Sequence, residues 1–421
     1  MKAVLRPAFL LVAACALWSG CAGSGSGASN ADATAVPVAG ASPVSAQDAA
    51  LRAALQQNIN LYLKTRARPE HLSAVSFSLS RPGNPENINL TAGTNEFGGG
   101  GGDVTPSGLY QVGSITKSFT SVAILHLAAA GKLGLDDTVG KWLPQYPAWK
   151  SITIRRLLNM TSGIPTYDET PAFQSAFAKD PMHFFSAAQL VSFVYPLPGH
   201  AAVFKPGYYY SNTAYILAQM IAQRASGVAF DDLIRDRVIA PQHLTDTFYD
   251  ANVYPPAIRA RTVPGYFVTR APEAAGLNAL YGKNVRDFSL SWAQGAGGIV
   301  ATPEDVTRWA RALFEGPLLA PTQRAEMQSI VSFAAGKPIA VTSVKDPNGF
   351  GLGLAQNTNR DMGTYWYYQG GTMGYRVVYV YFPASRIIYA VGLNSQPDEK
   401  QDQLGHLILT IFKTLQMKNA I

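Results

Sequence analysis

The spacing Ser114-x-x-Lys117 is the first feature of this sequence that can do chemistry. It begins a segment, residues 114–131, whose dense apolar positions predict the strongest helix in the chain. Residues three apart lie on one helix face, about 4.5 Å apart along the axis, so the Lys117 nitrogen can reach the Ser114 hydroxyl. Free N–H groups at a helix start also stabilise negative charge on the serine oxygen. The pair predicts a nucleophilic serine; the alternative is a capping serine with a surface lysine.

A second candidate set is Tyr210-x-Asn212, which comes just before another predicted helix. A tyrosine serves as a general base only where a nearby cation lowers its pKa from about 10, and Lys117 would do so. Asn212 would orient Lys117 by a hydrogen bond. Tyr208 and Tyr209 directly precede Tyr210, so either of them could hold the base position instead. The alternative for the whole set is an aromatic packing residue beside a helix cap.

The third set is Tyr368-x-Gly370-Gly371, which we expect to lie ahead of a strand that begins near Tyr375. Glycines beside a strand let a substrate backbone approach closely. The N–H of Gly371 could pair with that of Ser114 as an oxyanion hole. The alternative is simply a glycine-rich entry to a strand.

These three sets, in this order, resemble the serine β-lactamase and penicillin-binding superfamily, most closely its class C β-lactamases, D-alanyl-D-alanine carboxypeptidases and related esterases. The resemblance covers roughly residues 70–395. Further matching motifs are Leu135-Asp136-Asp137, Thr161-Ser162-Gly163 and Gly297-Gly298. The resemblance implies an acyl-serine mechanism without a cofactor. In it Ser114 attacks, Lys117 and Tyr210 move the protons, Asn212, Tyr368, Gly370 and Gly371 bind the substrate, and water releases the acyl group.

Two positions depart from the pattern of that superfamily. Met160 stands where a histidine is frequent, and Tyr368 stands where a lysine or histidine usually helps to hold the substrate carboxylate. A phenol is neutral at pH 7, so we expect esters and small uncharged amides to be better substrates than β-lactams or D-alanyl-D-alanine peptides. Arg376, on the following strand, could replace the missing cation. A carboxypeptidase or β-lactamase activity is therefore the alternative, and a non-catalytic penicillin-recognising module is the alternative from another class.

Hydrophobic patterning predicts an α+β fold in which one antiparallel sheet is built from both ends of the chain. Helices flank this sheet, and a largely helical region is inserted between its strands. The expected elements are a helix over 49–65, strands over 73–81 and 89–93, helical structure through 136–290, a hairpin of 375–382 and 387–393, and a helix over 403–415.

The composition of the 421 residues narrows the class of protein. Hydrophobic residues make up 47% and charged residues 14%, which is typical of a chain that buries a large core. The net charge of +7 is not gathered into blocks, and we find no nucleic-acid-binding motif, so no nucleic-acid partner is expected. The six histidines lack metal-ligand spacing, so we expect no metal site.

The N-terminus has the pattern of an export signal. Lys2 and Arg6 precede an apolar run over residues 8–18, which is too short to span a bilayer as a mature helix. Cys21 follows at the position where a lipoprotein signal ends, so we expect lipidation of Cys21 and a membrane anchor on the exported side. Ordinary cleavage nearby is the alternative. Removal of the signal takes away Cys15, which leaves no pair for a disulfide.

Three segments follow from these patterns. Residues 1–20 are the expected signal peptide. Residues 21–48, rich in Gly, Ser and Ala, are the expected flexible tether, and residues 49–421 form the expected hydrolase domain. The expected partners are a small ester, amide or peptide substrate and a membrane, the latter through the lipid.

Overall fold

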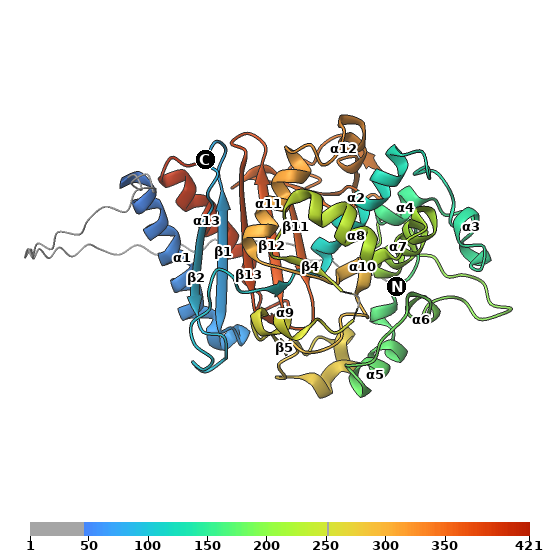
Figure 1. Ribbon diagram of the computed structural model, residues 1–421, viewed down its shortest axis with the longest axis horizontal. Coiled ribbons are helices and arrows are strands. Elements are labelled where there is room, and N and C mark those ends of the chain that lie inside the picture. Colours follow the sequence, from blue (N-terminus) through green and yellow to red (C-terminus); the bar gives the residue numbers. More distant parts are fainter. Residues whose placement is uncertain (1–45, 251) are drawn as a thin grey trace, which may run out of the picture.

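A computed structural model describes residues 46–250 and 252–421, so the expected signal peptide, Cys21 and almost all of the expected tether lie outside the described residues. One antiparallel sheet of nine strands dominates the structure (Figure 1). In the order in which they lie side by side, the strands are β2 (Ile88–Gly93), β1 (Ala74–Ser80), β13 (Ile387–Leu393), β12 (Arg376–Phe382), β11 (Gly363–Gly371), β10 (Ala355–Asn359), β9 (Asn348–Phe350), β7 (Ile330–Ser332) and β8 (Pro338–Ile339). Strands from both ends of the chain therefore meet in one sheet, which confirms the predicted α+β class.

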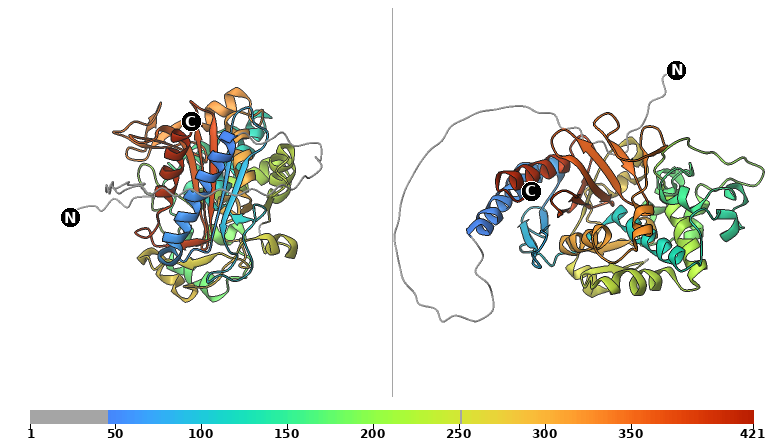
Figure 2. Two further views of the ribbon diagram at one scale, coloured as in Figure 1. Left: turned by 90° about the vertical axis from the view of Figure 1, so that its left-hand side faces the viewer. Right: turned by 90° about the horizontal axis from the view of Figure 1, so that it is seen from above.

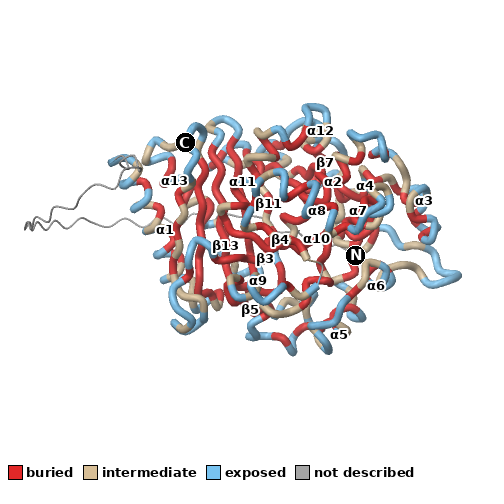
Figure 3. Tube along the Cα trace, in the orientation of Figure 1, coloured by how far each residue is buried: buried red, intermediate tan, exposed pale blue. Residues whose placement is uncertain are grey.

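The two faces of the sheet are covered by different parts of the chain. Helices α1 (Ala46–Glu70) and α13 (Leu404–Met417) pack on one face, side by side in both views of Figure 2. Helix α11 (Pro303–Phe314) packs on the other face against β1, β12 and β13. Each of these three strands is buried along its whole length (Figure 3). Successive side chains of a strand still face opposite sides of the sheet. Val75, Phe77 and Leu79 therefore lie together in the core under α1, as their spacing predicted.

The remaining helices form the inserted region, which lies beyond the sheet from α1 and α13 (Figure 1). They are α2 (Thr116–Ala129), α3 (Val139–Trp142), α4 (Ile154–Leu158), α5 (Pro171–Lys179), α6 (Ala187–Ser192), α7 (Asn212–Ser226), α8 (Phe230–Ile234), α9 (Pro256–Arg261), α10 (Gln294–Gly297) and α12 (Pro321–Met327). Two small sheets complete the fold: β3 (Tyr110–Gln111), β6 (Ile299–Ala301) and β4 (Thr247–Tyr249) in one, and β14 (Ser395–Pro397) with β5 (Tyr266–Val268) in the other. Within the described residues no helix is long and apolar enough to cross a membrane.

Where the candidate site lies, one predicted helix begins differently and one strand was not predicted. The helix expected from Ser114 begins as a 3₁₀ turn over Gly113–Ile115, and the α-helix α2 starts only at Thr116. Residues 368–371 do lie ahead of the strand expected near Tyr375, but they also form the C-terminal end of β11, a strand that the sequence did not predict. The chain then turns, with the N–H of Thr372 bonded to the carbonyl of Tyr375, and enters β12. Strand β11 was not predicted because it carries a polar and aromatic run without regular alternation.

Candidate active site

Ser114 lies in the 3₁₀ turn directly before α2 and is open to approach. Of residues 108–125, Ser114 alone is only partly buried, so it is the residue of this segment that solvent reaches. Gly113 makes the turn possible with a φ of +51°. The N-terminus of α2 directs N–H groups and the positive end of its dipole toward this position.

Lys117 is completely buried one turn later, and its ammonium group has three partners. Its Nζ donates to Ser114 Oγ at 3.0 Å, to Asn212 Oδ1 at 2.7 Å and to the carbonyl of Ala296 at 2.7 Å. Burial lowers the pKa of Lys117 to about 7, against an opposing effect of the negative charge of Asp168. Near neutral pH a large fraction of Lys117 is therefore an amine that can accept the Ser114 proton.

Tyr210 approaches Ser114 from the segment that leads into α7. Its hydroxyl donates to Ser114 Oγ at 2.6 Å and lies 3.3 Å from the Tyr368 hydroxyl. The two neighbouring tyrosines point elsewhere: Tyr208 stacks on Phe333 with ring centroids 4.2 Å apart, and the Tyr209 hydroxyl donates to Glu169 at 3.4 Å. The structure therefore places Tyr210, and neither of its neighbours, beside the serine.

The protonation expected for Tyr210 is wrong. Burial raises the pKa of Tyr210 to about 12, with only partial relief from its hydrogen bonds to Ser114 and Tyr368, so the side chain is a neutral phenol at pH 7. The pKa of Tyr210 is therefore not lowered by Lys117 as predicted. The Nζ of Lys117 lies 4.8 Å from the centroid of the Tyr210 ring, but burial removes much of the positive charge itself. Tyr210 is thus arranged as a proton donor in the resting site.

Asn212 is the first residue of α7, and the helix cap fixes its position. The Ser211 hydroxyl accepts from the Ala214 N–H at 3.2 Å, as an N-cap does. Met160, which stands where the superfamily often has histidine, holds the same segment: its carbonyl accepts from the Tyr209 N–H and its sulfur from the Ser211 N–H. The structural role of Met160 is therefore to position the segment that carries Tyr210 and Asn212.

Gly370 and Gly371 let β11 touch the turn that carries Ser114. A Cβ on Gly370 would lie 1.9 Å from the Val112 carbonyl oxygen and 2.7 Å from the Ser114 nitrogen, so only glycine fits there. A Cβ on Gly113 would lie 2.6 Å from the Gly371 carbonyl oxygen. The backbones of Ser114 and Gly371 are therefore neighbours, which is what an oxyanion hole made from their two N–H groups requires.

Tyr368 and Arg376 decide the charge of the site. Tyr368 is buried against Phe350, with ring centroids 5.6 Å apart, and burial raises the pKa of its phenol well above 10. The Arg376 side chain is fully buried on the opposite face of the sheet, where it donates to Glu70 and Asp402. The suggestion that Arg376 replaces the missing cation is therefore wrong. In the described part of the chain, Lys117 is the one Lys or Arg that hydrogen-bonds to Ser114, Tyr210 or Tyr368.

The structure adds two groups that the sequence did not single out. One is the carbonyl of Ala296 in α10, which accepts from Lys117. The other is Asp168, in the 3₁₀ turn Tyr167–Glu169, which accepts from Asn212 Nδ2 at 2.8 Å. A backbone carbonyl gives no sequence signal, and Asp168 lies 44 residues from Asn212 with no characteristic spacing.

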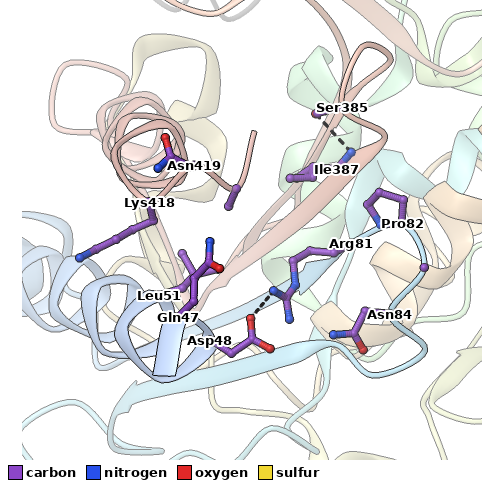
Figure 4. A pocket seen from close by; sticks show the side chains of 12 residues that line it. Gln47, Asp48, Leu51, Arg81, Pro82, Asn84, Ser385, Ile387, Lys418 and Asn419 are labelled. Atoms are coloured by element: carbon purple, nitrogen blue, oxygen red, sulfur yellow. Dashed lines mark hydrogen bonds and ion pairs between the residues drawn. The ribbon is translucent and has the colours of Figure 1, made fainter. Parts of the chain in front are cut away.

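A cavity of about 340 Å³ lies away from this site. It is bounded by the start of α1, the turn between β1 and β2 and the end of the chain, and Arg81 there forms an ion pair with Asp48 (Figure 4). It contains none of the residues grouped around Ser114. Within residues 46–250 and 252–421, no three His, Cys, Asp or Glu side chains are grouped so that they could hold a metal ion.

Comparison with known proteins gives matches in sequence. The family model described as Beta-lactamase matches residues 89–410. Penicillin-binding protein 4* of Bacillus subtilis (strain 168) is 26% identical over 298 residues, which are 70% of this chain and 62% of that protein. Protein flp of Staphylococcus aureus (strain NCTC 8325 / PS 47) is 28% identical over 220 residues, 51% of this chain and 40% of that protein. The chain thus spans less than two thirds of the length of these curated relatives.

Comparison of structures gives longer matches. A D-stereospecific amidohydrolase from Streptomyces sp. is 27% identical with a TM-score of 0.68, covering 85% of this chain and 97% of that one. The D-amino acid amidase from Ochrobactrum anthropi SV3 is 23% identical with a TM-score of 0.71, covering 87% and 99%. The D-alanine carboxypeptidase AmpC from Burkholderia cenocepacia is 18% identical with a TM-score of 0.64, covering 88% and 99%. At these lower identities the last two show a shared fold.

Proposed function

The chain belongs to the beta-lactamase family of serine hydrolases, and from this membership we propose that it hydrolyses uncharged amides and esters through an acyl intermediate on Ser114. The observation that carries the proposal is the pair of contacts on Ser114 Oγ, from Lys117 Nζ at 3.0 Å and from Tyr210 OH at 2.6 Å. A serine hydroxyl becomes a nucleophile when a positioned base takes its proton, and Lys117 in its amine form is such a base.

Acylation follows from the protonation of these groups. The Lys117 amine takes the Ser114 proton while Oγ bonds to the substrate carbonyl carbon, and the carbonyl oxygen becomes negative between the N–H groups of Ser114 and Gly371. The bond to the leaving nitrogen or oxygen then breaks, and that atom takes the phenol proton of Tyr210. The Lys117 ammonium returns a proton to the tyrosinate, which leaves both groups neutral.

Deacylation uses the same groups in the reverse sense. A water molecule takes the place of the leaving group and attacks the acyl carbon, while the Lys117–Tyr210 pair accepts its proton. Ser114 Oγ leaves with a proton from that pair, the acid product departs, and the site returns to its starting state.

The preference for uncharged substrates is inferred from the charge of the side chains around Ser114. Tyr368 is a buried neutral phenol and Arg376 is bound to Glu70 and Asp402. Among the described residues, the one Lys or Arg that hydrogen-bonds to Ser114, Tyr210 or Tyr368 is Lys117, whose nitrogen is already bound to Ser114, Asn212 and the Ala296 carbonyl, so a substrate carboxylate would gain no free cation from this group. The 27%-identical relative of known structure is named a D-stereospecific amidohydrolase, which supports an amide substrate.

A matched pair of substrates tests this preference. One is a peptide ending in D-alanyl-D-alanine, and the other is the same peptide with its terminal carboxylate converted to a primary amide. A carboxylate that leaves water for a site without a cationic partner pays a desolvation cost of about 1–3 kcal/mol or more, which the neutral amide largely avoids, so we expect kcat/KM to favour the amide by about tenfold or more. Equal rates, or a preference for the free acid, would contradict the proposal and favour a carboxypeptidase.

We also propose that the protein is exported and anchored to a membrane through a lipid on Cys21. The support is the signal-like N-terminus and the Gly-, Ser- and Ala-rich segment behind it. Each buried lipid methylene adds about 0.8 kcal/mol of membrane affinity. Cys21→Ser should therefore move the protein from the membrane fraction to the soluble fraction. Wild-type protein found wholly in the soluble fraction would refute the anchor.

A further inference from the structure

Asp168 is connected to the candidate nucleophile through a chain of short hydrogen bonds. Its Oδ2 accepts from Asn212 Nδ2 at 2.8 Å, Asn212 Oδ1 accepts from Lys117 Nζ at 2.7 Å, and Lys117 reaches Ser114 at 3.0 Å. The other oxygen of Asp168 accepts from the Thr166 hydroxyl. Asp168 does not touch Ser114 itself, so any effect on the chemistry must act through Asn212 and Lys117.

The chemistry of the amide shows what Asp168 does to Asn212. An asparagine side chain has a donor nitrogen on one side and an acceptor oxygen on the other. An ionised carboxylate only accepts, so Asp168 requires the nitrogen to face it, and the oxygen must then face Lys117. If the amide turned over, its N–H groups would face the Lys117 nitrogen, which must itself donate to Asn212 when it is protonated.

Thr166 fixes this arrangement further. Its hydroxyl donates to Asp168 and accepts from the backbone N–H of Asn212 at 3.1 Å. The turn Tyr167–Glu169 is tied to α7 a second time, because the Tyr167 N–H donates to Thr213 at 3.0 Å. Asp168 is therefore held in place on a rigid contact between two elements, as a group that positions another must be.

The charge of Asp168 also acts on Lys117. The groups that face Lys117 Nζ come from four elements: Ser114 before α2, Asn212 and Tyr215 with the preceding Tyr210 at α7, the Ala296 carbonyl in α10, and Asp168 in the 3₁₀ turn. The two tyrosines are neutral phenols, because burial raises their pKa values. Among the described residues, Asp168 is thus the carboxylate whose negative charge favours the ammonium form of Lys117.

We propose that Asp168 is a positioning residue for acylation: it holds Asn212 with its oxygen toward Lys117 and stabilises the ammonium that forms when Lys117 takes the Ser114 proton. The inference rests on the proposed acyl-serine function. It requires two separate effects of removing the carboxylate. The rate of acylation falls because Asn212 and the ammonium lose their support, and the pH at which Lys117 becomes an amine falls because a nearby negative charge is gone.

The experiment measures the rate constant for labelling by an uncharged fluorophosphonate, followed by intact mass, between pH 5 and 9. Wild type should show an acidic limb near pH 7, where Lys117 gains its proton. Asp168→Asn keeps the shape of the side chain and removes its charge. It should lower the labelling rate constant on the high-pH plateau about ten- to a hundredfold, the size expected for one hydrogen bond to a charged group. Its acidic limb should move down by roughly one pH unit.

Glu169→Gln is the matched control, because it removes the same charge one residue away, from a side chain that contacts Tyr209. Its plateau and limb should match those of wild type within about twofold. Asp168→Ala is measured in parallel, so that a folding defect of one variant does not decide the result. The rate constants come from time courses and do not depend on the fraction of folded protein.

The possible outcomes separate the inference from the function on which it rests. A loss of plateau together with a shift of the limb supports the positioning role. A loss without a shift, a shift without a loss, or a profile that superimposes on wild type overturns it. Failure of wild type itself to be labelled would instead contradict the proposed acyl-serine function.

Discussion

Replacing Tyr368 by histidine tests why this site should favour uncharged substrates. Tyr368 is buried, with its hydroxyl 3.3 Å from that of Tyr210 and its ring against Phe350. Histidine fits the same space and carries a positive charge when protonated. A hydrogen bond to a charged group is worth about 1.5–3 kcal/mol, or roughly ten- to a hundredfold in kcat/KM. Burial lowers the pKa of an imidazole, so only part of that gain is expected at neutral pH.

The assay compares the free-acid and amide forms of the same D-alanyl-D-alanine peptide at pH 6 and pH 8. The ratio of the two kcat/KM values is the quantity of interest, because altered activation of Ser114 affects both substrates equally and cancels. Tyr368→His should shift the ratio toward the free acid by about tenfold at pH 6. The shift should shrink at pH 8, because a neutral imidazole offers no charge.

Tyr368→Phe is the control for shape, since it removes the hydroxyl and adds no charge. Its absolute rates should fall because Tyr210 loses a hydrogen-bond partner, while its substrate ratio stays within about twofold of wild type. A histidine variant whose ratio equals that of wild type at both pH values would refute the reasoning from charge. The substrate carboxylate would then have to be held at another place.

Two further substitutions test other parts of the site and the fold. Tyr210→Phe should lower kcat for an amide about a hundred- to ten-thousandfold, because it removes the general acid. The loss should be smaller for a p-nitrophenyl ester, whose leaving group needs no proton. Equal losses for the two substrates would contradict the role of Tyr210 as general acid. Arg376→Met should destabilise the protein by up to about 3–5 kcal/mol in denaturant unfolding, because it removes a buried cation from Glu70, which keeps Arg66 and Tyr62, and from Asp402. Arg386→Met, at an exposed ion pair, should leave the unfolding midpoint almost unchanged. If Arg376→Met instead abolished kcat/KM for the folded protein, the placement of Arg376 away from the site would be wrong.

Local spacing made the central residues predictable from the sequence. Ser114 and Lys117 are three residues apart in a helical segment, so their contact follows from helix geometry alone, and the observed distance is 3.0 Å. The strands at the two ends of the chain were predicted because β12 and β13 are mostly apolar and β1 alternates apolar residues with serines. The alternation of Val75, Phe77 and Leu79 also indicated which side of β1 faces the core.

The features that the sequence did not predict depend on contacts between distant segments. Asp168 matters because a turn packs on α7, and no pattern along the chain records that contact. The direction of Arg376 depends on Glu70, more than three hundred residues earlier, which takes the guanidinium to the far face of the sheet. The protonation of Tyr210 was mistaken because burial, which only the folded structure reveals, raises the pKa of its phenol.

The acyl-serine mechanism is tested most directly by whether Ser114 itself becomes acylated. Wild type and Ser114→Ala are incubated with an uncharged fluorophosphonate and with a p-nitrophenyl ester, and the adduct is located by intact mass and peptide mapping. We expect one adduct per molecule, mapped to Ser114, and no adduct or turnover in Ser114→Ala, with thermal unfolding little changed. An adduct on another residue, or turnover that survives in Ser114→Ala, would contradict that mechanism.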